Sequence, residues 1–272
     1  MQDIALLLLR GVAERGARAG WAATPAGLLR YAIRGSPGAQ PLLLLHGLGD
    51  SLAGWARVAG PLARRFEVHL VDLPGHGLSQ KPPDWRLGTL AGAVAHYARG
   101  LRDPVIVGHS LGGWLALRLA LSGAVRPSRI ALVNPGGATL PREQWVPFRE
   151  LVSARDAKGV ARYLERAFHR APLALRLFPR EVIRAMSAPA CSGILDALAE
   201  EDFLREVELS PLLTPLRIVW GDRDRLLPEG TLGFFRRALP RAELVLLERA
   251  GHLPHIEAPR ALAHALLSPF PD

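Results

Sequence analysis

Six short, uninterrupted apolar runs are the feature that most constrains the fold of this 272-residue chain. Each run is rich in Leu, Val and Ile and ends at turn-forming residues. The runs are Leu42–Leu45, Val68–Val71, Val105–Val107, Ile130–Val133, Arg217–Trp220 and Leu244–Leu247. Continuous hydrophobicity is typical of strands that helices cover on both faces. Helical stretches such as Leu87–Arg102 and Leu111–Leu121 lie between the runs, so the sequence predicts an α/β fold with a mostly parallel central sheet and helices on both faces.

One long segment interrupts the alternation of strands and helices. Residues 138–209 contain no strand-like run, only helical periodicity with dense charge. Prolines are expected to divide this segment into about four short helices. They are Pro141, Pro147, Pro172, Pro179 and Pro189. The pattern predicts an all-helical cap at 138–209, inserted into a core formed by residues 1–137 and 210–272.

The sharpest local signal is the sequence G-H-S-L-G-G at residues 108–113, which lies between a predicted strand and a predicted helix. This is a G-x-S-x-G pattern in a strand–turn–helix context, where the glycines permit a tight, strained turn. Such a turn lifts the Ser110 hydroxyl above the carboxyl end of the sheet. It also places the Leu111 N–H at a helix N-terminus, where a developing oxyanion is stabilised. Ser110 is therefore the predicted nucleophile.

A serine hydroxyl needs a base, and the position of His252 selects it among nine histidines. His252 follows the last predicted strand, and loops at the carboxyl ends of parallel strands form the sites of open α/β sheets. His255 is the rival, with a structural role at the start of the final helix as its alternative interpretation.

Two aspartates follow the strand Arg217–Trp220, and both fit the chain order Ser…Asp…His. Asp224 lies farther into the loop and is the predicted partner of the imidazole. Asp222 lies at the strand end and is expected to cap the turn or to pair with Arg223 or Arg225.

The turn His46-Gly47-Leu48-Gly49-Asp50 follows the first predicted strand. Its backbone can present N–H groups to the Ser110 site, so the Leu48 N–H is the predicted second oxyanion donor beside that of Leu111. His46 is interpreted as organising the turn. A phosphate-binding role is rejected, because the chain has neither a Walker lysine nor G-x-G-x-x-G.

Together these motifs resemble those of the α/β-hydrolase superfamily with a helical cap, over nearly the whole chain from Gly27 to Leu267. Residues 72–79 resemble the D-x-P-G-x-G-x-S turn of the family, residues 220–224 its W-G-x-x-D acid motif, and residues 251–259 its G-H…E-x-P histidine motif. The resemblance supports Asp224 and His252. Ser110 separates the chain from the haloalkane dehalogenases and epoxide hydrolases, which carry aspartate at that position. Within the superfamily the resemblance is nearest to the monoacylglycerol-lipase-like and carboxylesterase members.

Composition excludes several other classes of protein. The formal net charge of +9 is carried by scattered arginines rather than by a basic cluster, which argues against a nucleic-acid partner. Cys191 is the only cysteine, so neither an intramolecular disulfide nor a thiolate zinc cluster can form. No histidines have the spacing of a metal site, and no cofactor is expected. The sequence does not define the oligomeric state.

The N-terminal region has no membrane-spanning run and no signal-peptide pattern, so a cytoplasmic location is expected. Residues 4–18 could form an amphipathic helix that packs on the domain or makes weak contact with a membrane surface. Its apolar side would hold Ile4, Leu7, Leu8 and Val12, opposite Arg10, Glu14 and Arg18.

The resulting functional prediction is a serine hydrolase acting on a small carboxylic ester. Apolar cap residues, with Trp145 and Phe148 as substrate-binding candidates, would roof the cleft and favour short to medium acyl chains and monoacylglycerols. Two related activities use the same Ser110, Asp224 and His252 arrangement in relatives and stay open at this stage. They are hydrolysis of carbon–carbon bonds in ring-fission diketones and cofactor-free perhydrolysis. A non-catalytic binding role is disfavoured, because every element of the triad is present.

Overall fold

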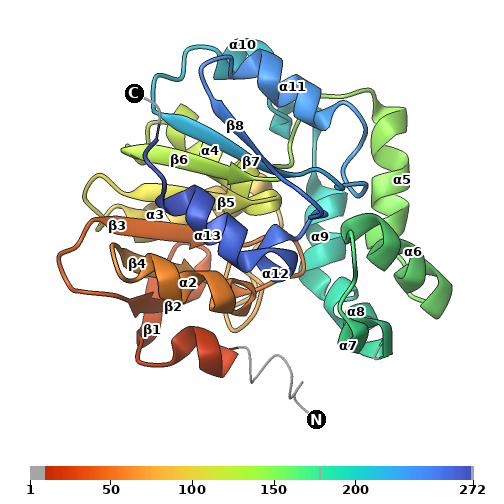
Figure 1. Ribbon diagram of the computed structural model, residues 1–272, viewed down its shortest axis with the longest axis horizontal. Helices are drawn as coiled ribbons and strands as arrows, with labels where there is room; N and C mark the ends of the chain where they lie inside the picture. The colour runs from red at the N-terminus through yellow and green to blue at the C-terminus, as the bar shows by residue number, and fades with distance from the viewer. Residues whose placement is uncertain (1–9, 178, 271–272) are drawn as a thin grey trace.

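The protein, a computed structural model that describes residues 10–177 and 179–270, is built on one eight-stranded sheet (Figure 1). The order across the sheet is β1-β2-β4-β3-β5-β6-β7-β8, and only β2 runs against the others. The strands are β1 (Arg18–Thr24), β2 (Gly27–Arg34), β3 (Pro41–Leu45), β4 (Glu67–Val71), β5 (Val105–His109), β6 (Arg129–Val133), β7 (Leu216–Gly221) and β8 (Glu243–Leu247). Strands β3 to β8 match the six apolar runs and confirm the predicted α/β class.

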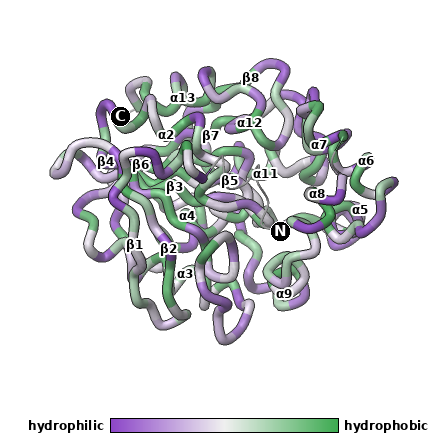
Figure 2. The backbone as a smooth tube through the Cα atoms, turned by 90° about the horizontal axis from the view of Figure 1, so that it is seen from below, coloured by the Kyte–Doolittle hydropathy of each residue, from purple (hydrophilic) through white to green (hydrophobic). Residues whose placement is uncertain are grey.

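Two helical layers explain why those runs are apolar throughout. Alternate residues of a strand point to opposite faces. Leu43 and Ile106 pack on one face and Leu44 and Val107 on the other, each in a separate core. The helices are α2 (Ala56–Leu62), α3 (Leu87–Ala98), α4 (Leu111–Leu121), α11 (Thr231–Ala238), α12 (Pro254–Glu257) and α13 (Pro259–Leu267), with the short 3-10 helix η1 (Leu52–Trp55). Figure 2 shows the hydrophobic segments concentrated between these layers.

The hairpin β1–β2 is absent from the sequence prediction. Its residues are mostly half-exposed, and only Leu29 and Ala32 are buried. Gly27 turns the hairpin at φ 103°, a left-handed conformation that favours glycine. A search for continuous apolar runs does not detect such an edge hairpin, because one side of it faces water. The predicted helix 87–102 also ends early, at Ala98.

The predicted N-terminal helix is corrected in extent and orientation. Within the described residues it spans only 10–14, and β1 begins at Arg18. Val12, expected on the packed side, is half-exposed, whereas Arg10, expected on the exposed side, is buried against Asp72. The reversal arises because the Asp72 carboxylate provides a buried partner for the guanidinium. Ile4, Leu7 and Leu8 lie outside the described residues.

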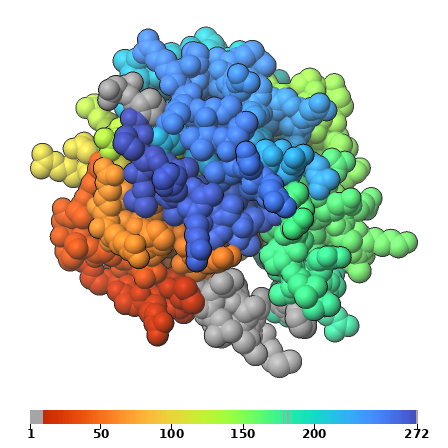
Figure 3. Space-filling model, viewed as in Figure 1, coloured from red at the N-terminus to blue at the C-terminus, as the bar shows by residue number. Residues whose placement is uncertain are grey.

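The segment between β6 and β7 is helical, but it holds more helices than the four expected. They are α5 (Arg142–Val152), α6 (Ala157–Ala167), α7 (Leu173–Leu177), α8 (Pro179–Met186), α9 (Pro189–Ala197), the 3-10 helix η2 (Glu200–Asp202) and α10 (Glu206–Leu209). Pro147 does not divide the chain as predicted, since it lies inside α5. The residues of α5 to α8, coloured green, gather along one side of the molecule in the space-filling view (Figure 3), whereas α10 lies beside α11 (Figure 1). Among the described residues, no helix is long and apolar enough to cross a bilayer.

Candidate active site

Ser110 lies in a strained turn between β5 and α4. Its backbone has φ 50° and ψ −114°, a conformation that costs of order 1–3 kcal/mol for a residue other than glycine. The Ser110 N–H donates to the Val133 carbonyl at 3.0 Å, and the Ser110 carbonyl accepts from Gly136 at 3.0 Å. Its residual exposure is 8%. Neighbouring backbone thus holds the turn in the geometry that the G-x-S-x-G pattern predicts.

Two glycines of the pattern are required by close backbone approach. A Cβ on Gly108 would lie 2.2 Å from the Gly112 carbonyl oxygen, and a Cβ on Gly112 would lie 2.3 Å from that of Leu45. Both separations are shorter than non-bonded atoms allow. The glycines therefore let α4 begin directly above the ends of β3 and β5.

His252 and Asp224 meet as the sequence predicts. The His252 Nδ1–H donates to Asp224 Oδ2 at 2.8 Å, and both side chains are almost fully buried. The loop before Ser110 contacts this pair directly, since His109 Nε2–H donates to the His252 carbonyl at 2.8 Å. The His252 N–H donates to the Ala167 carbonyl at the end of α6, at 2.7 Å. Three segments thus lie together at this point: the turn around Ser110 (residues 108–112, the nucleophile turn), the segment after β8 that holds His252 (residues 248–255, the histidine loop) and the end of α6.

Asp224 is further held by Asn134, which sequence analysis did not select. The Asn134 side-chain amide donates to Asp224 Oδ2 at 2.7 Å, while Oδ1 accepts from the N–H groups of Leu226 and Leu227. Burial alone would raise the pKa of Asp224, but the charge and hydrogen bond of His252, with these other donors, lower it below its usual value. The only signal in the sequence was the position of Asn134, directly after a predicted strand.

Asp222 has the role expected of the rejected candidate. Its Oδ1 accepts from the Arg249 N–H at 2.7 Å, and its Oδ2 lies 3.3 Å from Arg223 Nε. These contacts fix the turn after β7 and the loop after β8. They direct the carboxylate toward those two loops, whereas Asp224 points to His252.

The turn after β3 lies against the nucleophile. A Cβ on Gly47 would lie 3.2 Å from Ser110 Cβ and 2.8 Å from His109 Nδ1, so only glycine fits there. His46 organises the turn: its Nδ1–H donates to the Gly47 carbonyl at 2.7 Å, and its Nε2 accepts from the Leu73 N–H at 2.9 Å. Gly47, the residue before Leu48, is therefore packed against Ser110. We refer to residues 46–50 as the oxyanion loop.

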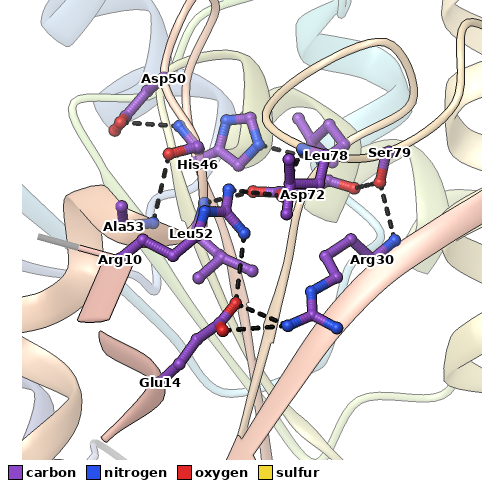
Figure 4. Close-up of polar contacts among 12 residues, drawn as sticks. Arg10, Glu14, Arg30, His46, Asp50, Leu52, Ala53, Asp72, Leu78 and Ser79 are labelled. Atoms are coloured by element: carbon purple, nitrogen blue, oxygen red, sulfur yellow. Dashed lines mark hydrogen bonds and ion pairs between the residues drawn. The ribbon is translucent and has the colours of Figure 1, made fainter. Parts of the chain in front are cut away.

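Asp72 ties this region to the N-terminal segment (Figure 4). Its carboxylate accepts from the N–H groups of Leu52 and Leu78 at 2.8 Å and pairs with Arg10 at 2.8 Å. A Cβ on Gly77 would lie 2.3 Å from this carboxylate, which explains the second glycine of the D-x-P-G-x-G-x-S turn. Asp72 thus joins the segments that follow β3 and β4, where they border the site.

The substrate-binding candidates Trp145 and Phe148 lie together on α5, with ring centroids 5.5 Å apart. Trp145 also packs on Phe203, at 5.4 Å. Phe148 lines a groove of about 540 Å³ between α5 and the loop that follows Asp224. The groove is further lined by Gln144, Pro147, Leu151, Arg166, Arg225, Leu226, Leu227, Pro228, Glu229 and Gly230.

Tyr163 of α6 is a second residue that sequence analysis missed. Its partly buried ring packs on the same apolar cluster as Leu48 and Phe148. Burial and the negative charges of Asp50 and Asp224 raise the pKa of its phenol, so it stays a neutral hydrogen-bond donor. In the sequence Tyr163 lies in an arginine-rich helical stretch, and that pattern does not indicate which way its ring points.

No group of three or more His, Cys, Asp or Glu side chains in the described ranges has the arrangement of a metal site.

Comparisons with known proteins found similar sequences and similar structures. A model of the alpha/beta hydrolase family matches residues 42–265. An uncharacterised protein of Mycobacterium tuberculosis is 31% identical, over 85% of this chain and 75% of its own. The pimeloyl-[acyl-carrier protein] methyl ester esterase of Aeromonas hydrophila is 32% identical, over 80% and 91%. The crystal structure of a bacterial membrane phospholipase A has a TM-score of 0.83 at 28% identity, covering 97% of this chain and 89% of its own.

The family match spans most of the chain and includes Ser110, Asp224 and His252, although β1 and β2 lie outside it. The chain therefore belongs to the α/β-hydrolase family.

Buried histidines near the site predict a loss of stability in mild acid. Burial and the charge of His46 lower the pKa of His76 to about 3, and burial also lowers the pKa of His69 and His109. An unfolded histidine binds a proton near pH 6.5, whereas His76 and His109 in the fold stay neutral well below that pH. Stability therefore falls as the pH drops from 6.5 toward the folded pKa, by about 1.4 kcal/mol per pH unit for each ring.

Urea unfolding at pH 7 and pH 5 measures this slope. His76→Gln is expected to lessen the loss between these pH values, because one titrating ring is gone, whereas His96→Gln at an exposed position of α3 should not. The lowered pKa values of Asp50 and Asp224 have the opposite sign: their contribution is lost only as the pH falls below about 3.8, outside this window. A His76→Gln slope equal to that of the wild type would contradict the assignment.

Proposed function

We propose that the protein is a serine hydrolase that cleaves carboxylic esters, with Ser110 as nucleophile, His252 as general base and Asp224 as the residue that orients the imidazole. The observation that carries the proposal is the 2.8 Å contact of His252 Nδ1 with Asp224 Oδ2, next to the strained Ser110 turn. With its proton fixed on Nδ1, His252 presents Nε2 as a free base. A buried Asp–His pair beside a serine on a strained strand–helix turn is the arrangement of nucleophilic serine catalysis.

The proposed reaction has two halves. The Ser110 hydroxyl attacks the ester carbonyl carbon while His252 takes its proton, and the imidazolium then protonates the departing alcohol. Water hydrolyses the acyl-enzyme by the same route, which returns the proton and frees the carboxylic acid. The Leu48 and Leu111 N–H groups bind the oxyanion in both halves, each contributing roughly 3 kcal/mol.

The relatives support an ester substrate. The Aeromonas hydrophila relative is named a methyl ester esterase, and the structure with a TM-score of 0.83 is that of a phospholipase A. The helices at 138–209 act as a cap in this proposal. The partly exposed rings of Phe148 and Tyr163 on α5 and α6 would wall an apolar site for a short or medium acyl chain.

A substrate panel tests the proposal. We expect hydrolysis of p-nitrophenyl esters and of monoacylglycerols, with triacylglycerols poorer because of their bulk. Two further assays, one with a ring-fission diketone and one for peracid formation, test the two other reactions that relatives catalyse with the same kind of triad. Turnover of the diketone with no ester cleavage would overturn the ester assignment while leaving the proposed nucleophile in place.

The proposed cap also predicts how kcat/KM depends on the length of the acyl chain. Each buried methylene adds about 0.8 kcal/mol until the site is full, so kcat/KM should rise from acetate to a short or medium optimum and then fall. Phe148→Ala should move this optimum toward longer chains, and Trp145→Ala should do so if its ring supports Phe148. The measurement is kcat/KM for p-nitrophenyl acetate to palmitate. A flat profile in the wild type, unchanged in both variants, would remove α5 from the specificity argument.

A further inference from the structure

A second Asp–His pair lies on the other side of the nucleophile turn. We infer that Asp50 and His255 are positioning residues that hold the oxyanion loop against the histidine loop, and so set the place of the Leu48 N–H. The inference rests on the proposed function, since it assigns a structural basis to the proposed oxyanion site. Neither side chain is proposed to touch the substrate.

Asp50 is fixed at the end of the oxyanion loop. Its N–H donates to the Gly47 carbonyl at 3.3 Å, which closes the turn around Leu48, and its Oδ1 accepts from the Ser51 N–H at 2.7 Å. The other carboxylate oxygen lies 3.3 Å from His255 Nε2. A Cβ on Gly54 would lie 2.3 Å from that oxygen, so the start of η1 leaves space for this carboxylate. These contacts hold the Asp50 carboxylate in a single position.

His255 is joined to the catalytic histidine by a column of rings. The centroids of His255 and His109 are 4.5 Å apart, and those of His109 and His252 are 4.9 Å apart. His109 also donates to the His252 carbonyl, while Trp55 packs on the far side of His255 at 5.2 Å. Any displacement of His255 therefore acts on the residue before Ser110 and on the His252 backbone.

The contact between Asp50 and His255 brings a negatively charged carboxylate to an imidazole ring. Burial would raise the pKa of Asp50, but the close approach of His255, with the charge of His46, lowers it, so the carboxylate is ionised at neutral pH. Burial and the neighbouring charges of His255 and His252 keep the His109 ring neutral by lowering its pKa. One anion on the oxyanion loop thus lies 3.3 Å from one imidazole on the histidine loop, where the His255 ring is buried and the Asp50 carboxylate is partly exposed.

Asp50 and His255 lie far apart in the sequence, so their contact links two separate loops. Asp50 lies in the turn after β3, and His255 is the second residue of α12, after the last strand of the sheet. The two loops carry different parts of the proposed machinery, the Leu48 N–H and the His252 imidazole. Oxyanion donors act only when they are placed within a few tenths of an ångström, so the link between the loops bears on rate rather than on substrate affinity.

The expected effect is a loss of kcat with little change in KM. Asp50→Asn keeps the shape of the side chain but removes its charge, and His255→Gln removes the imidazole. Each should lower kcat about 10- to 100-fold, part of the 10²- to 10³-fold cost of losing an oxyanion donor. Because the two act as one unit, the double variant should lose hardly more than either single variant. Asp84→Asn, at a carboxylate outside the site that accepts from Thr89, is the matched control.

A fluorophosphonate provides a readout that does not depend on the choice of ester. Its reaction with Ser110 passes through a charged oxygen in the oxyanion site, so its rate constant should fall by the same factor as kcat. The fraction of folded protein is measured in parallel by thermal unfolding, and rates are referred to it.

The outcomes separate the two proposals. Unchanged kcat and phosphonate rates in Asp50→Asn and His255→Gln would overturn the positioning role, as would losses that are strictly additive or that appear in KM alone. Wild-type protein that reacts with the phosphonate but cleaves no ester would overturn the ester proposal and leave the positioning role to be decided by the phosphonate rates. Wild-type protein that the phosphonate does not label at Ser110 would overturn both.

Discussion

Replacement of Ser110 with alanine is expected to abolish ester turnover in a protein that remains folded. Loss of a serine nucleophile lowers kcat by about 10⁶-fold in a well-studied protease, and a residual rate of about 10³-fold over water survives through the oxyanion site. Here the Leu48 and Leu111 N–H groups and the cap would still bind the ester. The measurement is kcat for p-nitrophenyl butyrate with purified variant, against the spontaneous rate.

The fold should tolerate this change. Among the described residues the Ser110 hydroxyl makes no hydrogen bond to the protein, and the turn is held by backbone contacts with Val133 and Gly136 that alanine retains. The free energy of unfolding should therefore change by no more than about 0.5 kcal/mol. Ser122→Ala is the control, because Ser122 is the C-cap of α4, at the end of the helix opposite the nucleophile turn. Esterase activity near that of the wild type in Ser110→Ala would falsify the assignment of the nucleophile, and loss of phosphonate labelling is its independent check.

The sheet was predictable because its signal is local. Every residue of β3 and β4 except the first is buried, so the hydrophobic run and the strand coincide almost residue for residue. The β1–β2 hairpin has no such run, because one side of it faces water. Its place at the sheet edge depends on pairing with β4, through contacts such as Ala32 with Leu70, which no local pattern encodes.

The polar residues of the site could be predicted only where they belong to a local sequence motif. Gly108, Ser110 and Gly112 belong to a short turn whose geometry requires those residue types. Asn134 and Arg10 act instead through partners 90 and 62 positions away along the chain, Asp224 and Asp72. Amphipathic periodicity assigned Arg10 to the exposed side because periodicity assumes that charge seeks water. A buried carboxylate reverses that preference, since an unpaired buried charge costs more than a paired one.

Asp224→Asn is expected to lower kcat by about 10⁴-fold, the size seen for the corresponding change in a serine protease. In the structure Asp224 Oδ2 accepts both the His252 Nδ1–H and the Asn134 amide. A carboxamide at this place would meet the Asn134 donor with its oxygen and turn its own N–H toward His252. The imidazole would then carry its proton on Nε2, where it cannot accept the proton of Ser110.

Asp222→Asn provides the comparison, because the two aspartates are two residues apart after the same strand. Asp222 accepts from the Arg249 N–H and pairs with Arg223, so its loss should loosen the turn after β7 and leave the His252 tautomer unchanged. We expect kcat within about 10-fold of the wild type for Asp222→Asn, since the change acts on a loop rather than on the proton acceptor. Both variants are compared at equal folded fraction. The reverse ranking would transfer the orienting role to Asp222, and equal losses in both would mean that the turn as a whole, rather than one carboxylate, holds the imidazole.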